Sequence, residues 1–352
     1  MDHNDPQVIA TRAGEALYAR SHPEHQLSEP ARAYAHMTML DVSRDSLRRS
    51  GVNTSGMSPE TIITRSLGGL HTTSDFPLIL GDFVNREMRT RYNSAPSAVR
   101  QVAKQSSSRD FRAKHKLMLG GFSDLEKVNE AGEFKSGTIN EAGETYRLHR
   151  AGRILGVSYQ AMVNDDLGAF TGIAAEMSTS ALSYQFDTLV NMILSNPAMS
   201  DGNAVFSAAH GNITGAYAFN TLTLSAARTA MRRQKGLGGM LIDVTPRYLL
   251  VPPELETDGE KLIVEISATT TDDVNPFSKL TLLVEPRLTD PEQYYIVANP
   301  ATVDGLEYAY LEGAPGPQIE TRAGFEVDGI QFKISLNFGA GWIDHRGWYR
   351  VG

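Results

Sequence analysis

His210 is the residue whose sequence context is most suggestive of chemistry. It stands in the segment Phe206-Ser207-Ala208-Ala209-His210-Gly211-Asn212, where an imidazole could act as a general base. A catalytic base needs a nucleophile to activate and an acid to orient it, and the sequence identifies neither. We therefore favour a structural role in a loop where Gly211 supplies an unusual backbone angle. A hydrolase that uses His210 is kept as a remote alternative.

The other clusters of reactive side chains have simpler interpretations. The segment His22-Pro23-Glu24-His25 contains proline and lacks the i, i+4 histidine spacing of a zinc protease helix, so a solvated segment is expected. Asp272-Asp273 could contact a cation, but two carboxylates in a polar loop are usually solvated. The run His71 to Asp75 holds His, Thr, Ser and Asp, whereas the members of a catalytic triad converge from distant segments. We predict no catalytic residue and no metal site.

Composition and motifs exclude further classes. The chain has 352 residues, no cysteine and a net charge of −8, which excludes thiolate chemistry and argues against a large nucleic-acid footprint. Phosphate-loop, dinucleotide and Gly-x-Ser-x-Gly motifs are absent, and Gly236-Leu237-Gly238-Gly239 follows a predicted helix, which favours a turn. No run of about 20 apolar residues and no signal-peptide pattern occurs. We expect no cofactor and no membrane association.

The apolar spacing predicts an α+β chain. The first thirty residues are polar and are interpreted as a mobile or partner-bound tail. A helix of roughly 30 residues is predicted from about 165 to 196, with Asn164 or Asp165 as its cap and Asn196-Pro197 at its end. Other helices are predicted from Ala31 toward Arg49, after Ser58-Pro59-Glu60, after Asp75, from Leu224 to Lys235 and from Glu254 to about Ile266. Short strands are predicted at 241–251, 280–285, 294–298 and 306–311.

Residues from about Arg109 to Tyr159 resemble a long two-stranded arm. Apolar residues lead outward to a tip rich in Gly, Glu, Asn and Lys, and Tyr146, Leu148, Ile154 and Val157 return. A two-stranded ribbon is marginal in water by itself, so this arm must lie on something else. The support is either a neighbouring subunit or, as for most lone arms, the body of its own domain.

The C-terminal region gives the clearest local pattern. After Asp328-Gly329, the apolar residues Ile330, Phe332, Ile334, Leu336 and Phe338 alternate with polar ones. Alternation after Asp-Gly predicts a β-hairpin with one buried face.

The order of several motifs resembles the Mu-like major capsid proteins of tailed phages, including those made fused to a prohead protease. These motifs are the segments His71 to Leu80, Phe206 to Asn212, Leu222 to Leu224, Ala230 to Gly236, Pro246 to Glu256 and the ending Gly339 to Gly347. The resemblance runs from about Ala33 to the C-terminus, and it implies the Hong Kong 97 phage capsid fold.

The resemblance also implies a division of the chain. It assigns 1–108 to an N-terminal tail and helical arm, 109–160 to the E-loop, 161–240 and 316–352 to the peripheral domain, and 241–315 to the axial domain. The assembly candidates in the arm are Phe122, Leu125, Lys127, Phe134, Lys135 and Tyr146. One relative crosslinks its shell through an E-loop lysine, but neither Lys127 nor Lys135 matches that motif, so no crosslink is expected.

The function implied is that of a structural capsid protein. We expect copies of the chain to form hexamers and pentamers that close an icosahedral shell around double-stranded DNA, without sequence-specific binding. The expected partners are the chain itself, a portal, and decoration or scaffold proteins; the expected location is the virion, after assembly in the host cytoplasm. The alternative in a related class is the shell of an encapsulin-like compartment with a protein cargo.

Overall fold

A computed structural model of the chain describes residues 5–68, 75–119, 141–215, 218–237, 239–264, 279–323 and 329–352. They fall into two units, each assembled from three segments of the chain. Unit 1 comprises Met1–Ala95, Arg150–Tyr184 and Gly316–Asn337. Unit 2 comprises Pro96–His149, Gln185–Pro315 and Phe338–Gly352.

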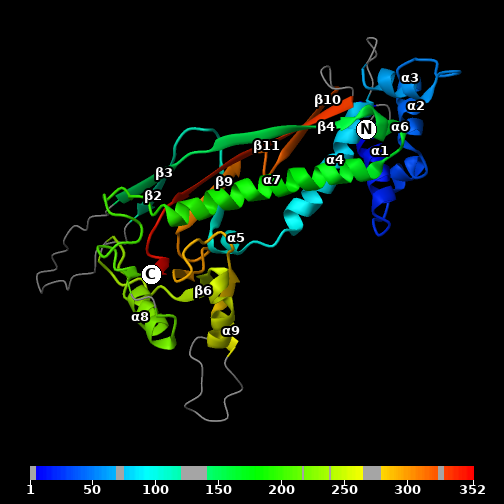
Figure 1. Ribbon diagram of the computed structural model, residues 1–352. Coiled ribbons are helices and arrows are strands. Elements are labelled where there is room, and N and C mark those ends of the chain that lie inside the picture. The colour runs from blue at the N-terminus through cyan, green and yellow to red at the C-terminus, as the bar shows by residue number, and fades with distance from the viewer. Residues whose placement is uncertain are drawn as a thin grey trace, which may run out of the picture. The chain divides into compact units, whose positions relative to one another are not determined.

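Unit 1 is mainly helical (Figure 1). Side-chain caps define the starts of several of its helices. Thr38 and Asp41 form a reciprocal capping box, and Ser58 accepts a hydrogen bond from the Thr61 amide with Pro59 at the first helical position. Leu17 lies 1% exposed in the core that these helices share. The helices are α1 (Pro6–Ser21), η1 (Glu29–Tyr34), α2 (Met39–Arg49), α3 (Pro59–Ser66), α4 (Phe76–Ser94), α6 (Tyr159–Val163) and the first part of α7 (Leu167–Leu194).

The prediction of a mobile or partner-bound N-terminal tail is wrong. Asp5 caps α1, and Ile9, Ala13 and Leu17 form a buried stripe at i, i+4 and i+8 that packs within unit 1 beside α4. The buried face also includes the small residues Ala10, Gly14 and Ala16, and the polar residues between them made it hard to recognise in the sequence.

The segment predicted to be solvated at His22 to His25 is exposed at Pro23 and Glu24, whereas the two histidine side chains are 35% and 32% exposed and make contacts. The His22 ring stacks on Tyr18 with a centroid distance of 4.3 Å, and its Nε2 lies 3.2 Å from Glu87 Oε2. The His25 Nε2 atom lies 3.4 Å from a carboxylate oxygen of Glu15. Both histidines therefore hold the end of α1 and the chain that follows it.

The long helix is α7, which has 28 residues. Its start differs from the prediction, because Asp166 rather than Asn164 or Asp165 accepts the hydrogen bond from the Ala169 amide. Asp165 has a positive φ of 54° and instead accepts from the Met39 amide at 2.8 Å and from Arg20 at 2.5 Å.

The predicted C-terminal hairpin is present in unit 1. Strand β10 (Gln318–Ala323) pairs antiparallel with the first part of β11 (Gly329–Trp342), from Gln318 opposite Ser335 to Ala323 opposite Ile330. Ile330, Phe332 and Ile334 are buried while Gln331 and Lys333 are half-buried, so one face points inward as predicted. Asp328 lies outside the described residues.

Strand β4 (His149–Ser158) pairs with β11. The sequence pattern placed these residues in the returning strand of the arm, and the structure contradicts that placement. Gly152 explains the pairing, because a Cβ atom there would lie 2.6 Å from the Ile334 carbonyl oxygen. Phe83, Phe170 and Phe332 join α4, α7 and β11 in the core of unit 1, with ring centroids 6.2 and 6.1 Å apart.

Unit 2 contains three groups of strands among its described residues. In the first, β9 (Leu306–Leu311) pairs in parallel with β1 (Lys104–Ser108) and antiparallel with the end of β11, and α5 (Ala98–Val102) precedes β1. In the second, β2 (Lys114–Leu119) and β3 (Glu141–Tyr146) pair antiparallel as a two-stranded ribbon.

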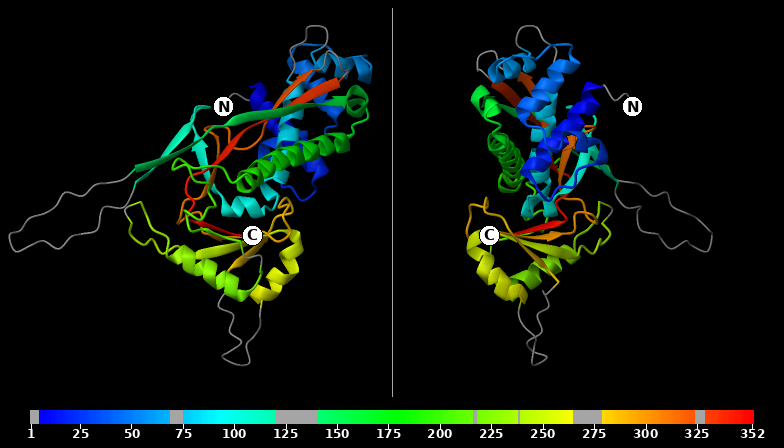
Figure 2. Two further views of the ribbon diagram at one scale, coloured as in Figure 1. Left: turned by 60° about the vertical axis from the view of Figure 1, so that its left-hand side comes forward. Right: turned by 90° about the vertical axis from the view of Figure 1, so that its right-hand side faces the viewer.

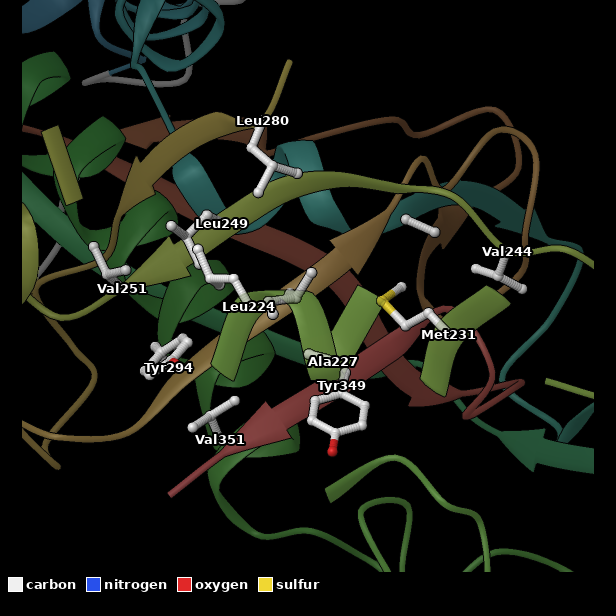
Figure 3. Close-up of a cluster of buried hydrophobic side chains, with 12 residues drawn as sticks. Leu224, Ala227, Met231, Val244, Leu249, Val251, Leu280, Tyr294, Tyr349 and Val351 are labelled. Atoms are coloured by element: carbon white, nitrogen blue, oxygen red, sulfur yellow. The ribbon is translucent and has the colours of Figure 1, made fainter. Parts of the chain in front are cut away.

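The third group is a five-stranded sheet covered on one face by helices (Figure 2). Its helices are α8 (Thr221–Arg232), capped by Asn220, and α9 (Glu256–Val264), preceded by the short η3 (Pro253–Leu255). Figure 3 shows the apolar cluster between helices and sheet, which includes Leu224, Leu249, Tyr294 and Val351. The strand order is β5 (Ile213–Thr214), β12 (Trp348–Val351), β8 (Tyr294–Ala298), β6 (Pro246–Val251), β7 (Thr281–Val284).

Candidate assembly site at the base of the ribbon

His210 braces a loop. Its Nε2 atom lies 2.8 Å from Asp201 Oδ2, its Nδ1 atom lies 3.0 Å from the Val205 carbonyl oxygen, and its backbone carbonyl accepts a hydrogen bond from Gln234. The ring stacks on that of His345 at a centroid distance of 3.6 Å. Both ring nitrogens are thus engaged in contacts within the loop, and Gly211 has the predicted positive φ of 62°. The geometry supports the structural role rather than the hydrolase.

The described residues hold no cluster of three or more His, Asp or Glu side chains arranged for a metal ion. His71 and Asp272-Asp273 lie outside those residues. No helix in the described part of the chain combines the length and the apolar content needed to cross a bilayer.

The most elaborate polar arrangement lies at the base of the β2–β3 ribbon, within unit 2. Lys114 lies opposite Tyr146 in the ribbon, and Lys116 follows two residues later on the same face. The three side chains converge on Glu307 of β9, which is 2% exposed. Lys114 donates to one carboxylate oxygen at 2.9 Å, Lys116 to the other at 2.6 Å, and the Tyr146 hydroxyl donates to the first at 2.7 Å. We call these four residues the Glu307 clamp.

A second carboxylate extends the clamp. Asp304 lies 3.3 Å from the Lys116 ammonium and accepts from Lys104 of β1 at 2.7 Å. Lys114 also donates to the Ser106 hydroxyl. The first strand of the ribbon is therefore held to β1 and β9 by charge-assisted hydrogen bonds, which are stronger than neutral ones.

Protonation equilibria follow from this geometry. Burial alone would raise the pKa of Glu307, but the hydrogen bonds from Lys116, Tyr146 and Lys114 outweigh it and hold the pKa below its usual range. Burial and the adjacent Glu307 carboxylate raise the pKa of Tyr146 far above its usual range. Burial opposes the charge of Lys116, yet contact with Glu307 and Asp304 raises its pKa. Glu307 is thus ionised and Tyr146 protonated at neutral pH.

The returning strand has its own attachments. Glu144 of β3 accepts hydrogen bonds from the amide and hydroxyl of Ser200, at 2.9 and 2.6 Å. The backbone that follows β3 passes close to β11, because a Cβ atom at Gly339 would lie 2.2 Å from the Arg147 carbonyl oxygen. The base of the ribbon therefore rests on the body of its own unit.

Of the predicted assembly residues, the structure describes only Tyr146, which is 7% exposed and part of the clamp. The candidates Phe122, Leu125, Lys127, Phe134 and Lys135 lie outside the described residues. Sequence reasoning missed Glu307 and its lysines. Two signals were available: a lone acid inside the apolar run Leu306 to Leu311, and lysines at alternate positions of one strand.

Residues 142–351, more than half of the chain, match the phage capsid protein family, and the chain belongs to that family. Membership confirms the sequence-based resemblance and disfavours the encapsulin alternative. Together with the α+β architecture, it also confirms the Hong Kong 97-type fold class.

Comparison with other proteins adds distant likenesses. No curated protein matches the chain. A structure of the capsid of a native GTA particle is 12% identical to this chain with a TM-score of 0.48, and a structure from Mycobacterium phage Bobi is 12% identical with a TM-score of 0.47. Each match covers 73% of this chain and 90% of the other chain. A virus-like particle from Pyrococcus furiosus is 13% identical with a TM-score of 0.45, covering 76% of this chain and 98% of its own.

Proposed function

We propose that this chain is the major capsid protein of a tailed phage. Copies assemble into hexamers and pentamers that close an icosahedral shell around double-stranded DNA. Membership of the phage capsid family is the observation that carries this proposal. The same proposal places the protein in the virion after assembly in the cytoplasm of a bacterial host, with a portal and decoration or scaffold proteins as further partners.

The ribbon gives the proposal a physical basis. A closed ring of identical subunits requires two different surfaces on each copy, so that one surface of each subunit binds the other surface of the next. The Glu307 clamp fixes the base of a two-stranded ribbon, a structure that gains stability only when it packs against something else. Phe122, Leu125, Lys127, Phe134 and Lys135 are proposed to contact an adjacent copy.

The proposed division of the chain follows the capsid fold. The resemblance assigns residues 1–108 to the N-terminal arm, 109–160 to the E-loop, 161–240 with 316–352 to the peripheral domain, and 241–315 to the axial domain. In the structure β4 pairs with β11 instead of the outgoing strand of the arm, and β5, α8 and β12 join the sheet and core of β6, β7 and β8. We propose that the chain has no catalytic function and encloses DNA through its shell rather than through base contacts. The net charge of −8 supports that form of packaging, because phosphate binding needs clustered Lys and Arg.

The test is expression of the chain in a bacterium, followed by sedimentation and electron microscopy. Closed particles or free hexamers and pentamers are the expected result. Particles recovered from infected or induced host cells should contain nuclease-protected DNA and no enriched cargo enzyme. Persistent monomers under conditions that keep the protein folded would contradict the proposal.

A further inference from the structure

The five-stranded module of unit 2 has two chemically different ends. Both β12 and β6 pair antiparallel with β8, so they run in the same direction. The turn that follows α8 lies at the N-terminal end of these strands, because Arg346, two residues before β12, donates to the Lys235 carbonyl oxygen at 2.7 Å. Helix α9 begins just after the C-terminal end of β6. About 20 Å of strand separates the two ends.

The first end carries exposed apolar side chains in the segment that follows α8. Met240, Leu241 and Ile242 are 45%, 65% and 41% exposed, although they are consecutive and large. Backbone hydrogen bonds from Gly236 to Met240 and from Ile242 to Gln234 close the turn, and the buried Arg346 side chain fixes its base. Three consecutive exposed apolar residues on an ordered turn are unfavourable in water and mark contact surfaces. In Figure 3 the neighbouring Met231 and Val244 mark this end, and Val251 lies at the other.

The same end is basic. The sequence from Thr221 to Lys235 contains Arg228, Arg232, Arg233 and Lys235 and no acid. Arg232 pairs with Asp243 at 2.8 Å and lies in the last turn of α8, where a cation favours the helix dipole. Arg233 and Lys235 lie beyond that helix, are exposed, and have no carboxylate partner among the described residues.

The opposite end is acidic. The sequence from Pro252 to Glu260 contains Glu254, Glu256, Asp258 and Glu260, all exposed, and no base. Glu256 and Asp258 lie in the first turn of α9, where acids favour the helix dipole, and Asp258 pairs with Lys261. Glu254 precedes α9 and Glu260 follows its first turn, so the dipole does not account for them. The half-buried Leu255 supplies an apolar surface between these acids.

We infer that the module is a head-to-tail connector between copies of this chain. The basic end with its apolar turn (Met240, Leu241, Ile242, Arg233 and Lys235) docks on the acidic end (Glu254, Leu255 and Glu260) of the next copy. The occupant is a second copy because the two ends are complementary in charge and different in structure, which is the requirement for a heterologous ring contact. The inference rests on the proposed self-assembly and names one surface that performs it.

Reversing the charges at the two ends of the module tests the proposed contact between copies. Variant A carries Glu254→Lys and Glu260→Lys, which spare the acids in the first turn of α9. Variant B carries Arg233→Glu and Lys235→Glu, which spare the Arg232–Asp243 pair. Each variant should lose assembled particles by about tenfold or more, because like charges then face each other, and the combined four-residue variant should recover most of them. Circular dichroism and thermal melting identify any variant that has lost its fold.

The outcomes separate the two proposals. A wild-type protein that forms no rings or shells contradicts the proposed function. A wild-type protein that assembles, with variants A and B assembling equally well, overturns the connector, and so does a combined variant no better than either parent. A matched control, Glu24→Lys with Glu312→Lys, changes the net charge as variant A does at exposed positions outside the two ends and should assemble normally.

Mixing the two purified variants gives a second readout that does not depend on folding of the combined variant. Variant A is basic at both ends and variant B is acidic at both, so they can alternate around a ring only if the number of subunits is even. The mixture should therefore form six-membered rings and no five-membered rings, and closed shells should be absent. Five-membered rings in the mixture, or no association of A with B, would overturn the connector.

Discussion

Replacement of Glu307 is the sharpest test of how the ribbon is held. Glu307→Ala leaves two ammonium groups and a phenol at the ribbon base without their shared acceptor. Truncating one partner of a buried ion pair typically costs about 3 to 5 kcal/mol. The lysine side chains at positions 114 and 116 are 22% and 26% exposed, so they can recover part of their hydration. We therefore expect a loss of about 2 to 3 kcal/mol in the free energy of unfolding of unit 2.

The measurement combines urea unfolding with amide hydrogen exchange. Exchange of the backbone amides paired between β2 and β3 should accelerate, while exchange in α1 and α4 of unit 1 should not change. Glu320→Gln is the matched control, because Glu320 and Lys333 form an exposed pair, 57% and 42% accessible, whose loss should leave the free energy of unfolding nearly unchanged. A Glu307→Ala variant as stable as this control, with unchanged protection of β2, would refute the clamp.

The pH dependence of the clamp has a definite sign. Because the folded pKa of Glu307 is lowered from 4.5, its contribution to stability is complete above that pH and is lost as the pH falls through the lowered value. Wild-type protection of β2 should decline in that acidic range. The Glu307→Gln variant, which cannot titrate, should lose that part of the decline.

Four further substitutions test the packing and the pH dependence of stability. Gly339→Ala should destabilise unit 2 by about 2 kcal/mol in urea unfolding, since its Cβ would meet a carbonyl oxygen at 2.2 Å, whereas Gly172→Ala, with no atom within 4 Å of the added Cβ, should stabilise α7 by about 0.5 to 1 kcal/mol. Leu17→Ala should cost unit 1 about 3 kcal/mol, and a near-zero cost would restore the tail interpretation. The pKa of His345 is lowered from 6.5 to about 3, mainly by burial and then by His210 and Arg346. The free energy of unfolding should therefore fall by up to about 1.4 kcal/mol per pH unit as the pH drops from 6.5 to about 3. In the His345→Gln variant, which cannot titrate there, this decrease should be smaller.

Much of the secondary structure could be predicted from local sequence patterns. Strands β8 and β9 have the predicted bounds because both are largely apolar runs between Pro, Asp and Gly. The long helix and the C-terminal hairpin were also predicted, since each is defined by a period that a single segment displays. The start of α7 was less well predicted because Asp165, a good cap by residue type, is used for a tertiary contact with Arg20.

Non-local features were not predictable in the same way. The buried face of α1 contains the small residues Ala10, Ala13 and Ala16 between Ile9 and Leu17, a weak apolar pattern whose burial depends on a partner helix far along the chain. Strand β4 was assigned to the arm because the alternation within a strand does not indicate which strand pairs with it. Its pairing with β11 involves a close approach at Gly152 that the sequence pattern does not reveal. The Glu307 clamp joins residues 161 to 193 positions apart, and no local pattern specifies such a distance.

The chemistry of the clamp explains why an ionic group is placed where an apolar one would fit. A buried ion pair adds little net stability compared with well-packed apolar side chains, but it penalises every arrangement in which its members are apart. A slip of one residue in β2 would turn Lys114 and Lys116 to the opposite face of the ribbon and leave Glu307 charged and buried without a partner. If apolar side chains filled this position at the foot of the ribbon, such a slip in register would cost much less free energy. In the shell of identical subunits that we propose, each ribbon meets its neighbour in the same register, and the clamp would then favour uniformity of the ribbon over maximal stability of the subunit.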